Sequence, residues 1–262
     1  MEASTTEECR LSKEGLPESL CSLRSKLYCK AKREPRFRFY TLYGHMYRDD
    51  VLEAAWKRVK RGGKSPGIDG VTTGDIVRAD GVEALLRGIQ EDLKARTYRP
   101  QPVLRTYIPK ADGGLRPLGI PTVRDRIVQT ACLLILEAVF EADFKESSHG
   151  FRPKRSAYDA LDQIKQNLQA GRKVVYDADL KGYFDSIPHD KLMACLEMRI
   201  SDRKVLHLIR LWLNAPVKEK DDPKAGKGGG NKLTRSKQGT PQGGCMTPRT
   251  QKITLNFLSA YR

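Results

Sequence analysis

The 262-residue sequence lacks the Cys-x-x-Cys spacing that structural zinc sites commonly use, and it has only four histidines. Its cysteines are scattered along the chain with no regular spacing: Cys9, Cys21, Cys29, Cys132, Cys195 and Cys245. Neither a zinc site nor a disulfide framework is therefore predicted. A chain of this kind is expected in a reducing, cytoplasmic compartment.

Long hydrophobic runs are also missing. The longest, residues 131–136, is far too short to cross a bilayer, and the N-terminus has no apolar segment of the kind found in signal peptides. We therefore expect no membrane partner. The Gly-rich stretch in residues 218–237 has no GxxxxGK[ST] phosphate-binding motif, so it is interpreted as a flexible, basic loop.

Acidic residues are scarce relative to basic ones. Lys and Arg number 48 against 32 Asp and Glu, giving a net charge of +16 and a pI near 9.6, and no acidic residue follows Asp222. This balance favours a polyanionic partner, with nucleic acid as the first candidate. Because the charge is spread along the chain, a long groove fits better than one small anion site. A merely basic, well-solvated surface is the alternative.

Hydrophobic periodicity predicts a mixed α and β order in one continuous domain. Residues 103–109 and 115–120 are expected to form a hairpin, because Gly113 and Gly114 suit a tight turn. An aspartate, Asp49 or Asp50, is expected to cap the second helix. The expected helices, of which the fourth and fifth are assigned to the core, cover residues 23–32, 49–61, 81–96, 123–140, 157–168, 190–198 and 202–214.

The residues that point most directly to chemistry are Asp177 and Asp179. They follow Val174 and Val175, which suit a buried strand, and residues two apart on a strand point the same way. Carboxylates at the edge of a sheet attract a hard cation such as Mg²⁺. The alternative is an ordinary strand that ends in a turn rich in Asp and Gly.

Four further segments surround this strand in a fixed order. Together the five segments resemble the reverse transcriptase domain of group II intron-encoded reverse transcriptase/maturase proteins, from about Leu23 to Pro248. The four segments are Ser65-Pro66-Gly67-Ile68-Asp69-Gly70, Arg116-Pro117-Leu118-Gly119-Ile120-Pro121, Gly150-Phe151-Arg152-Pro153 with Ser156, and Gln238-Gly239-Thr240-Pro241-Gln242-Gly243-Gly244.

The resemblance implies an α+β (mixed α/β) right-hand polymerase fold, with an incomplete antiparallel palm sheet and packed helices. It places fingers in residues 23–121 and a partial palm in residues 122–248, which includes the basic loop 218–237. Residues 1–22 are expected to be a poorly ordered tail, and residues 249–262 an atypical C-terminal tail.

By the same resemblance, Asp179 is the catalytic metal ligand, and the carbonyl oxygen of Leu180 binds the same ion. Two Mg²⁺ ions would then support nucleotidyl transfer. Phe184 is expected to close the sugar pocket against a ribose 2′-hydroxyl, although an aromatic beside a strand also suits plain core packing.

The remaining implied site residues bind substrate or nucleic acid. Lys110 and Arg116 would clamp the dNTP phosphates, and Gln242 would line the nucleotide pocket. Solvated strand residues and a simple turn are the respective alternatives. Positioning contacts with the template backbone, which a generic basic loop explains nearly as well, are expected from Arg152, Lys154 and Arg155. His189 and Asp190 suit a helix start rather than general-base catalysis.

The sequence departs from the family after Gly244, because it has no aromatic-x-Asp-Asp motif. A truncated or frame-shifted gene, or a first piece completed by another chain, would explain this. The expected function is an RNA-directed DNA polymerase domain acting on group II intron RNA, a DNA primer and dNTPs, inactive alone because the metal site lacks its opposing carboxylates. A non-catalytic intron-RNA-binding remnant and an incompletely folded relic are the alternatives. The oligomeric state is not predicted.

Overall fold

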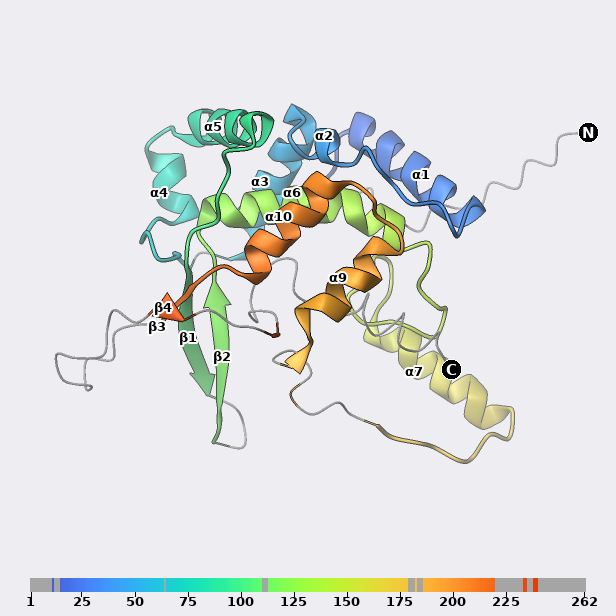
Figure 1. Cartoon of the computed structure of the whole chain (residues 1–262). Helices are drawn as coiled ribbons and strands as arrows, with labels where there is room; N and C mark the ends of the chain where they lie inside the picture. Colours follow the sequence, from blue (N-terminus) through green and yellow to red (C-terminus); the bar gives the residue numbers. More distant parts are fainter. Residues whose placement is uncertain are drawn as a thin grey trace, which may run out of the picture.

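The computed structural model describes residues 11, 15–63, 65–109, 113–178, 182, 186–219, 233–234 and 238–239. Its architecture is mixed α and β, with helices packed around one central helix and a small sheet to one side (Figure 1). The expected fold class is confirmed. The helices are α1 (Glu18–Arg33), α2 (Tyr43–Met46), α3 (Asp49–Gly62), α4 (Thr73–Arg78), α5 (Val82–Ala95), α6 (Val123–Phe140), α7 (Ala157–Gln169), α9 (His189–Glu197) and α10 (Arg203–Leu213).

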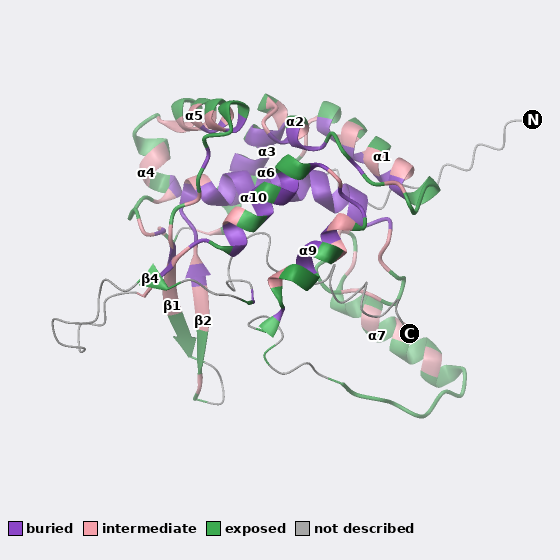
Figure 2. Ribbon diagram, in the orientation of Figure 1, coloured by how far each residue is buried: buried purple, intermediate pink, exposed green. Residues whose placement is uncertain are grey.

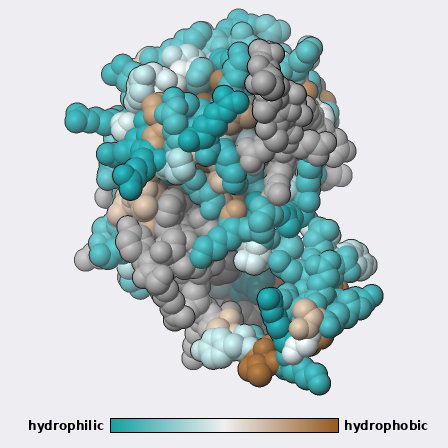
Figure 3. All heavy atoms as spheres, turned by 90° about the vertical axis from the view of Figure 1, so that its right-hand side faces the viewer, coloured by the Kyte–Doolittle hydropathy of each residue, from teal (hydrophilic) through white to brown (hydrophobic). Residues whose placement is uncertain are grey.

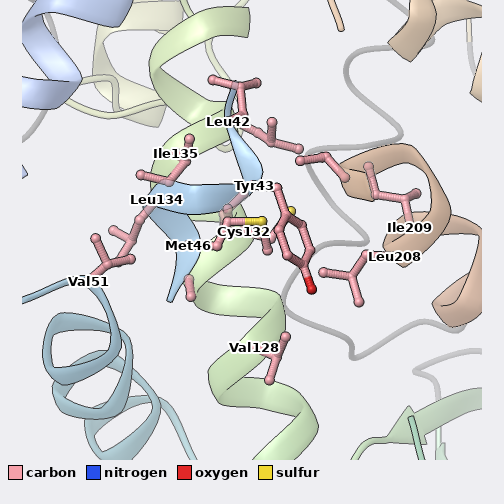
Figure 4. Close-up of a cluster of buried hydrophobic side chains, with 14 of the residues drawn as sticks. Leu42, Tyr43, Met46, Val51, Val128, Cys132, Leu134, Ile135, Leu208 and Ile209 are labelled. Atoms are coloured by element: carbon pink, nitrogen blue, oxygen red, sulfur yellow. The ribbon is translucent and has the colours of Figure 1, made fainter. Parts of the chain in front are cut away.

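The central helix, α6, is buried on every side, and Arg124 is its one residue that is not fully buried. A helix that is hydrophobic all round has to be enclosed by other elements. Helices α1, α2, α3 and α5 contact it directly. Figure 4 shows the packing on one side, where Tyr43 of α2 lies between Cys132 of α6 and Leu208 of α10. The predicted helix over residues 123–140 is thus confirmed as the core.

The sheet contains β1 (Val103–Pro109), β2 (Leu115–Ile120), β3 (Val217–Glu219) and β4 (Leu233–Thr234), in the order β2-β1-β3-β4. The predicted hairpin is confirmed: β1 and β2 pair antiparallel, with Leu104 opposite Ile120 and Ile108 opposite Arg116. Gly113 has a φ of 80°, which glycine adopts without strain. β3 lies parallel to β1 and joins the sheet to the end of α10.

Two buried arginines link segments that are distant in the sequence. Arg24 donates to Glu137 and to the carbonyl oxygen of Leu134, which fixes α1 on α6. Arg199 donates to the carbonyl oxygens of Ala31, Glu34, Pro35 and Phe37. Its Nε also lies 3.0 Å from a carboxylate oxygen of Asp143. Arginine suits this position because its planar fork of donors can satisfy several carbonyl groups at once.

The helix boundaries agree closely with the periodicity, but expectations for two regions are wrong, and the first region contains the starts of α1 and α3. The N-cap of α3 is Arg48, and no side chain caps its N-terminus. Asp49 and Asp50 lie in the first turn instead, and Asp50 accepts hydrogen bonds from the Arg48 guanidinium. The helix α1 begins at Glu18, inside the range expected to be a tail, and Leu11 is buried.

The second correction concerns α7 and the segment that follows it. Helix α7 forms as predicted, but none of its residues is buried, and Leu161 and Ile164 are 58% and 54% exposed (Figure 2). Residues 172–178 form no strand, and Val174 is 97% exposed. A strand requires a hydrogen-bonded neighbour, and the described residues place none beside this segment. The predicted buried strand is therefore wrong for residues 172–178.

None of the helices in the described part of the chain combines the length and the apolar character that a bilayer span needs. Figure 3 shows one face of the molecule, over which hydrophilic residues predominate.

Candidate nucleic-acid and nucleotide site

The loop carrying the first motif packs against the end of the second. A Cβ atom built on Gly67 would lie 2.6 Å from the Cα atom of Thr122 and 3.0 Å from the carbonyl carbon of Pro121, closer than real Cβ contacts allow. Gly67 is therefore required by space. Asp69 and Gly70 form a turn, because the Gly70 amide donates to the Gly67 carbonyl oxygen and Gly70 has a φ of 72°. The fold thus joins two segments that were recognised separately in the sequence.

A buried carboxylate anchors the root of the hairpin. Asp125, on the first turn of α6, accepts hydrogen bonds from the Tyr98 hydroxyl at 2.6 Å, the Gln101 amide at 3.0 Å and the Thr122 hydroxyl at 2.8 Å. The Trp212 indole in turn donates to the Tyr98 hydroxyl. Burial raises the pKa of Asp125, and these hydrogen bonds oppose that rise. The network holds the start of β1 against α6.

The hairpin presents basic side chains from a rigid ladder. Arg116 is exposed on β2, opposite Ile108. Arg105 lies on β1, where its Nε is 3.9 Å from a Glu219 carboxylate oxygen, and the Tyr107 hydroxyl donates to the same carboxylate at 3.1 Å. β3 therefore neutralises part of the charge on β1. Lys110 lies outside the described residues.

The Gly150–Ser156 segment separates its basic residues into inward and outward groups. The Arg152 side chain is 1% exposed, and its guanidinium contacts Glu141 at 2.7 Å and donates to the carbonyl oxygens of Lys145 and Ser148. Little of this guanidinium is left for a phosphate, so the geometry favours a structural role. Lys154 is exposed, and Arg155 pairs with the exposed Glu146 at 2.5 Å. Template contacts of Arg152, Lys154 and Arg155 stay predictions.

The expected metal ligands lie at the edge of the described residues. Asp177 is exposed at the end of residues 172–178, whereas Asp179, Leu180 and Phe184 lie outside the described residues. Within the described part of the chain, no three His, Cys, Asp or Glu side chains are grouped so that they could hold a metal ion. The described residues alone therefore do not make up a Mg²⁺ site.

The start of the fourth motif lies beside α9. The Gly239 amide donates to the Ile187 carbonyl oxygen at 2.8 Å, and an imidazole nitrogen of His189 lies 2.7 Å from the Gly239 carbonyl oxygen. Pro188 and Gln238 form an isolated β-bridge. His189 thus anchors this motif rather than serving only at a helix start, a contact that no sequence pattern indicated. Gln242 lies outside the described residues.

Arg126 is a positioning residue that the sequence did not single out. It is 8% exposed on α6 and donates to the carbonyl oxygens of Gly63 at 3.4 Å and Ser65 at 2.8 Å. These bonds hold the first-motif loop over α6. The sequence does contain a signal for this role, because Arg126 directly follows Arg124 and Asp125 on a helix that is expected to lie in the core.

Comparison with known proteins places this geometry in a family. The model of the family "Reverse transcriptase (RNA-dependent DNA polymerase)" matches residues 108–260. The chain is 35% identical over 249 residues to Protein YkfC of Escherichia coli strain K12, covering 92% of this chain and 62% of that protein. It is 37% identical over 227 residues to the Group II intron-encoded protein LtrA of Lactococcus lactis subsp. cremoris, covering 85% of this chain and 35% of that protein.

A protein in the cob intron of Schizosaccharomyces pombe is 34% identical over 245 residues, covering 90% of this chain and 28% of that protein. The chain thus spans less than two thirds of the length of each of these relatives. The family match covers more than half of the chain, and the structure joins the motifs at Gly67 and Gly239 to Thr122 and Ile187. The chain belongs to the reverse transcriptase (RNA-dependent DNA polymerase) family.

Proposed function

We propose that this chain is the RNA-directed DNA polymerase domain of a group II intron protein, acting on intron RNA as template, a DNA primer and dNTPs. The observation that carries the proposal is the packing of Gly67 against Pro121 and Thr122, with the Asp125 network beside it. This packing fixes the root of a basic hairpin, as required of a strand pair that positions a nucleotide.

The hairpin residues would act on the triphosphate. Arg116, and Lys110 by the family match, would form charge-assisted hydrogen bonds to phosphate oxygens and stabilise the charge that develops there. Gln242 would line the nucleotide pocket, and Phe184 would exclude a ribose 2′-hydroxyl. Arg105 is less available for this role because Glu219 lies beside it.

Asp179 and the carbonyl oxygen of Leu180 are the residues that would hold Mg²⁺, which would activate the primer 3′-hydroxyl and neutralise phosphate charge when bound. A division into fingers (23–121) and partial palm (122–248) goes with this proposal. Cys29, Cys132 and Cys195 are free thiols, which favours a reducing, cytoplasmic location.

Primer extension on an RNA template, with Mg²⁺ and dNTPs, tests the polymerase proposal. We expect Asp179→Ala to abolish any extension and Arg116→Ala to raise the KM for dNTP. The matched control is Arg87→Ala, which removes an exposed arginine of α5 that pairs with the surface residue Glu83. Extension that does not depend on metal or on Asp179 would contradict the assigned site.

The second candidate is a non-catalytic, maturase-like RNA-binding protein. The net charge of +16 favours it, because a basic surface is enough to bind an RNA backbone. Its signature would be intron RNA affinity that falls steeply with salt and is unchanged by Asp179→Ala. If purified chain extends a primer, this candidate is excluded as the sole function.

A further inference from the structure

A pocket of about 170 Å³ lies between the C-terminus of α5 and the N-terminal half of α10, in a part of the molecule that the reverse transcriptase motifs do not occupy. Its walls include Tyr43, Tyr98, Leu208 and Leu211. Tyr43 and Leu208 approach each other beside α6 in Figure 4. The pocket is therefore built on the rigid core rather than on a surface loop.

The tyrosine hydroxyls are engaged inside the protein. Tyr43 donates to the Leu93 carbonyl oxygen at 2.9 Å, and Tyr98 donates to Asp125 at 2.6 Å. Only 8% of Tyr43 and 3% of Tyr98 is exposed. The two tyrosines therefore line the pocket with ring carbon atoms, and the two leucines line it with aliphatic carbon atoms. Flat, apolar walls of this kind accept an aromatic base.

The rim of the pocket is basic. It consists of Arg96, Arg99, Arg203, Lys204 and His207, all of them exposed, and none of the described residues that line the pocket is acidic. Arg96 and Arg99 follow α5, whereas the other three lie on the first turns of α10. Positive groups thus face the opening from two separate elements, which suits a polyanionic backbone that enters on one side and leaves on the other.

The buried carboxylate of Asp202, next to Arg203 in the sequence, does not cancel this charge at the opening. Asp202 is 6% exposed, and it accepts hydrogen bonds from the backbone amides of Tyr43 at 2.8 Å and Lys204 at 3.0 Å. It serves as the N-cap of α10. These hydrogen bonds engage the carboxylate inside the fold, where it holds α2 against α10.

We propose that this pocket binds one unpaired nucleotide of single-stranded RNA, with the base between the tyrosine and leucine walls and the adjoining phosphates on the arginine and lysine rim. The volume suits a single base rather than a whole nucleotide, so the phosphates lie outside it. The proposal rests on RNA being the partner of this chain, but it needs neither metal nor nucleotidyl transfer.

The test compares a fluorescent nine-nucleotide RNA with the same oligomer carrying an abasic central position, titrated with the full chain at several salt concentrations. We expect the base to tighten binding about tenfold, as base stacking on protein rings does. Leu211→Phe fills the pocket and should remove that difference while leaving affinity for the abasic oligomer unchanged. The matched control is Leu161→Phe on the exposed face of α7, which should retain the difference.

Arg203→Ser tests the rim, with Lys191→Ser on α9 as the control for loss of one exposed charge. We expect Arg203→Ser to reduce the slope of log affinity against log salt by about 0.7, the value for one phosphate contact on a single strand, and Lys191→Ser to change it less. AMP serves as the free-nucleotide probe. If AMP displaces the RNA oligomer and the pocket binds AMP as tightly as the oligomer, the pocket is a mononucleotide site and the RNA proposal is wrong.

The outcomes separate this inference from the proposed function. Equal affinity for the two oligomers, or a difference that survives Leu211→Phe in a variant with wild-type thermal stability, overturns the pocket while RNA binding stands. Loss of fold in Leu211→Phe leaves Arg203→Ser and the abasic comparison in wild type to decide. Absence of RNA binding at low salt overturns the inference and the RNA partner together. Absence of primer extension overturns neither.

Discussion

The guanidinium of Arg24 donates a hydrogen bond to the carboxylate of Glu137 at 2.8 Å, where α1 crosses α6, and the two side chains are only 2% and 4% exposed. An ion pair that is so thoroughly desolvated depends on both partners. It lies beside a second buried pair, Arg152 with Glu141, and both arginines line a pocket of about 500 Å³.

Removal of one partner should therefore be costly. We expect Arg24→Met to lower the free energy of unfolding by about 3–5 kcal/mol, because Glu137 loses the buried guanidinium that donates to it at 2.8 Å. Urea denaturation measures the change. The double variant Arg24→Met with Glu137→Leu should recover much of the loss, and strict additivity of the two single effects would contradict a direct coupling.

Arg152 and Lys154 should separate stability from nucleic-acid binding. Arg152→Ala breaks the pair with Glu141 and should lower the free energy of unfolding measured with urea. Lys154→Ala, at an exposed position, should leave the free energy of unfolding within about 0.5 kcal/mol of wild type. RNA titration of the folded Lys154→Ala variant should show a shallower salt dependence. If Arg152→Ala is as stable as wild type, its assigned structural role is wrong.

Asp143 should make stability depend on pH. Burial raises the pKa of this carboxyl to about 6, and the Arg199 and Lys32 charges only partly oppose the rise. The folded state therefore holds the proton more tightly than the unfolded chain, so this group's contribution is full below about pH 4 and is lost as pH rises through 6. Unfolding free energies of Asp143→Asn should lack this decline. If the free energy of unfolding depends on pH in the same way in wild type and in Asp143→Asn, the role assigned to Asp143 is wrong. Asp162→Asn, at an exposed position of α7, is the control.

Gly67→Ala should loosen the root of the hairpin. The added methyl group would meet the backbone of Thr122 at 2.6 Å, and backbone cannot move aside as a flexible side chain can. We expect a clear loss in thermal stability. Gly88→Ala is the matched control, because nothing lies within 4 Å of its Cβ and alanine favours a helix interior by about 1 kcal/mol over glycine. If both variants are stabilised, the close approach is wrong.

The apolar face of α7 should contribute little to the stability of this chain. Leu161 is 58% exposed, so Leu161→Ser should change the free energy of unfolding by no more than about 0.5 kcal/mol. Leu134 is 1% exposed on α6, so Leu134→Ala should lower the free energy of unfolding by about 2–5 kcal/mol. A large loss in Leu161→Ser would mean that this helix is covered in solution.

The sequence by itself determined the local elements wherever the hydrophobic period was strong. The bounds of α6, β1 and β2 follow from it to the residue, because a long helix with a strong apolar period and two strands around Gly113 leave few alternatives. The family motifs determined the membership. The short helices α2 and α4 escaped prediction, because four and six residues carry too little periodicity to detect.

Tertiary structure alone decided which charged and apolar residues face inward. Arg24, Arg152 and Arg199 look like solvated basic residues in the sequence, but carbonyl oxygens and carboxylates from distant segments satisfy them in the core. Leu161 and Val174 look like core residues but are exposed, because burial depends on a neighbouring element and not on the side chain itself. Periodicity records what a face prefers, and only the packed chain determines whether a partner is there to cover it.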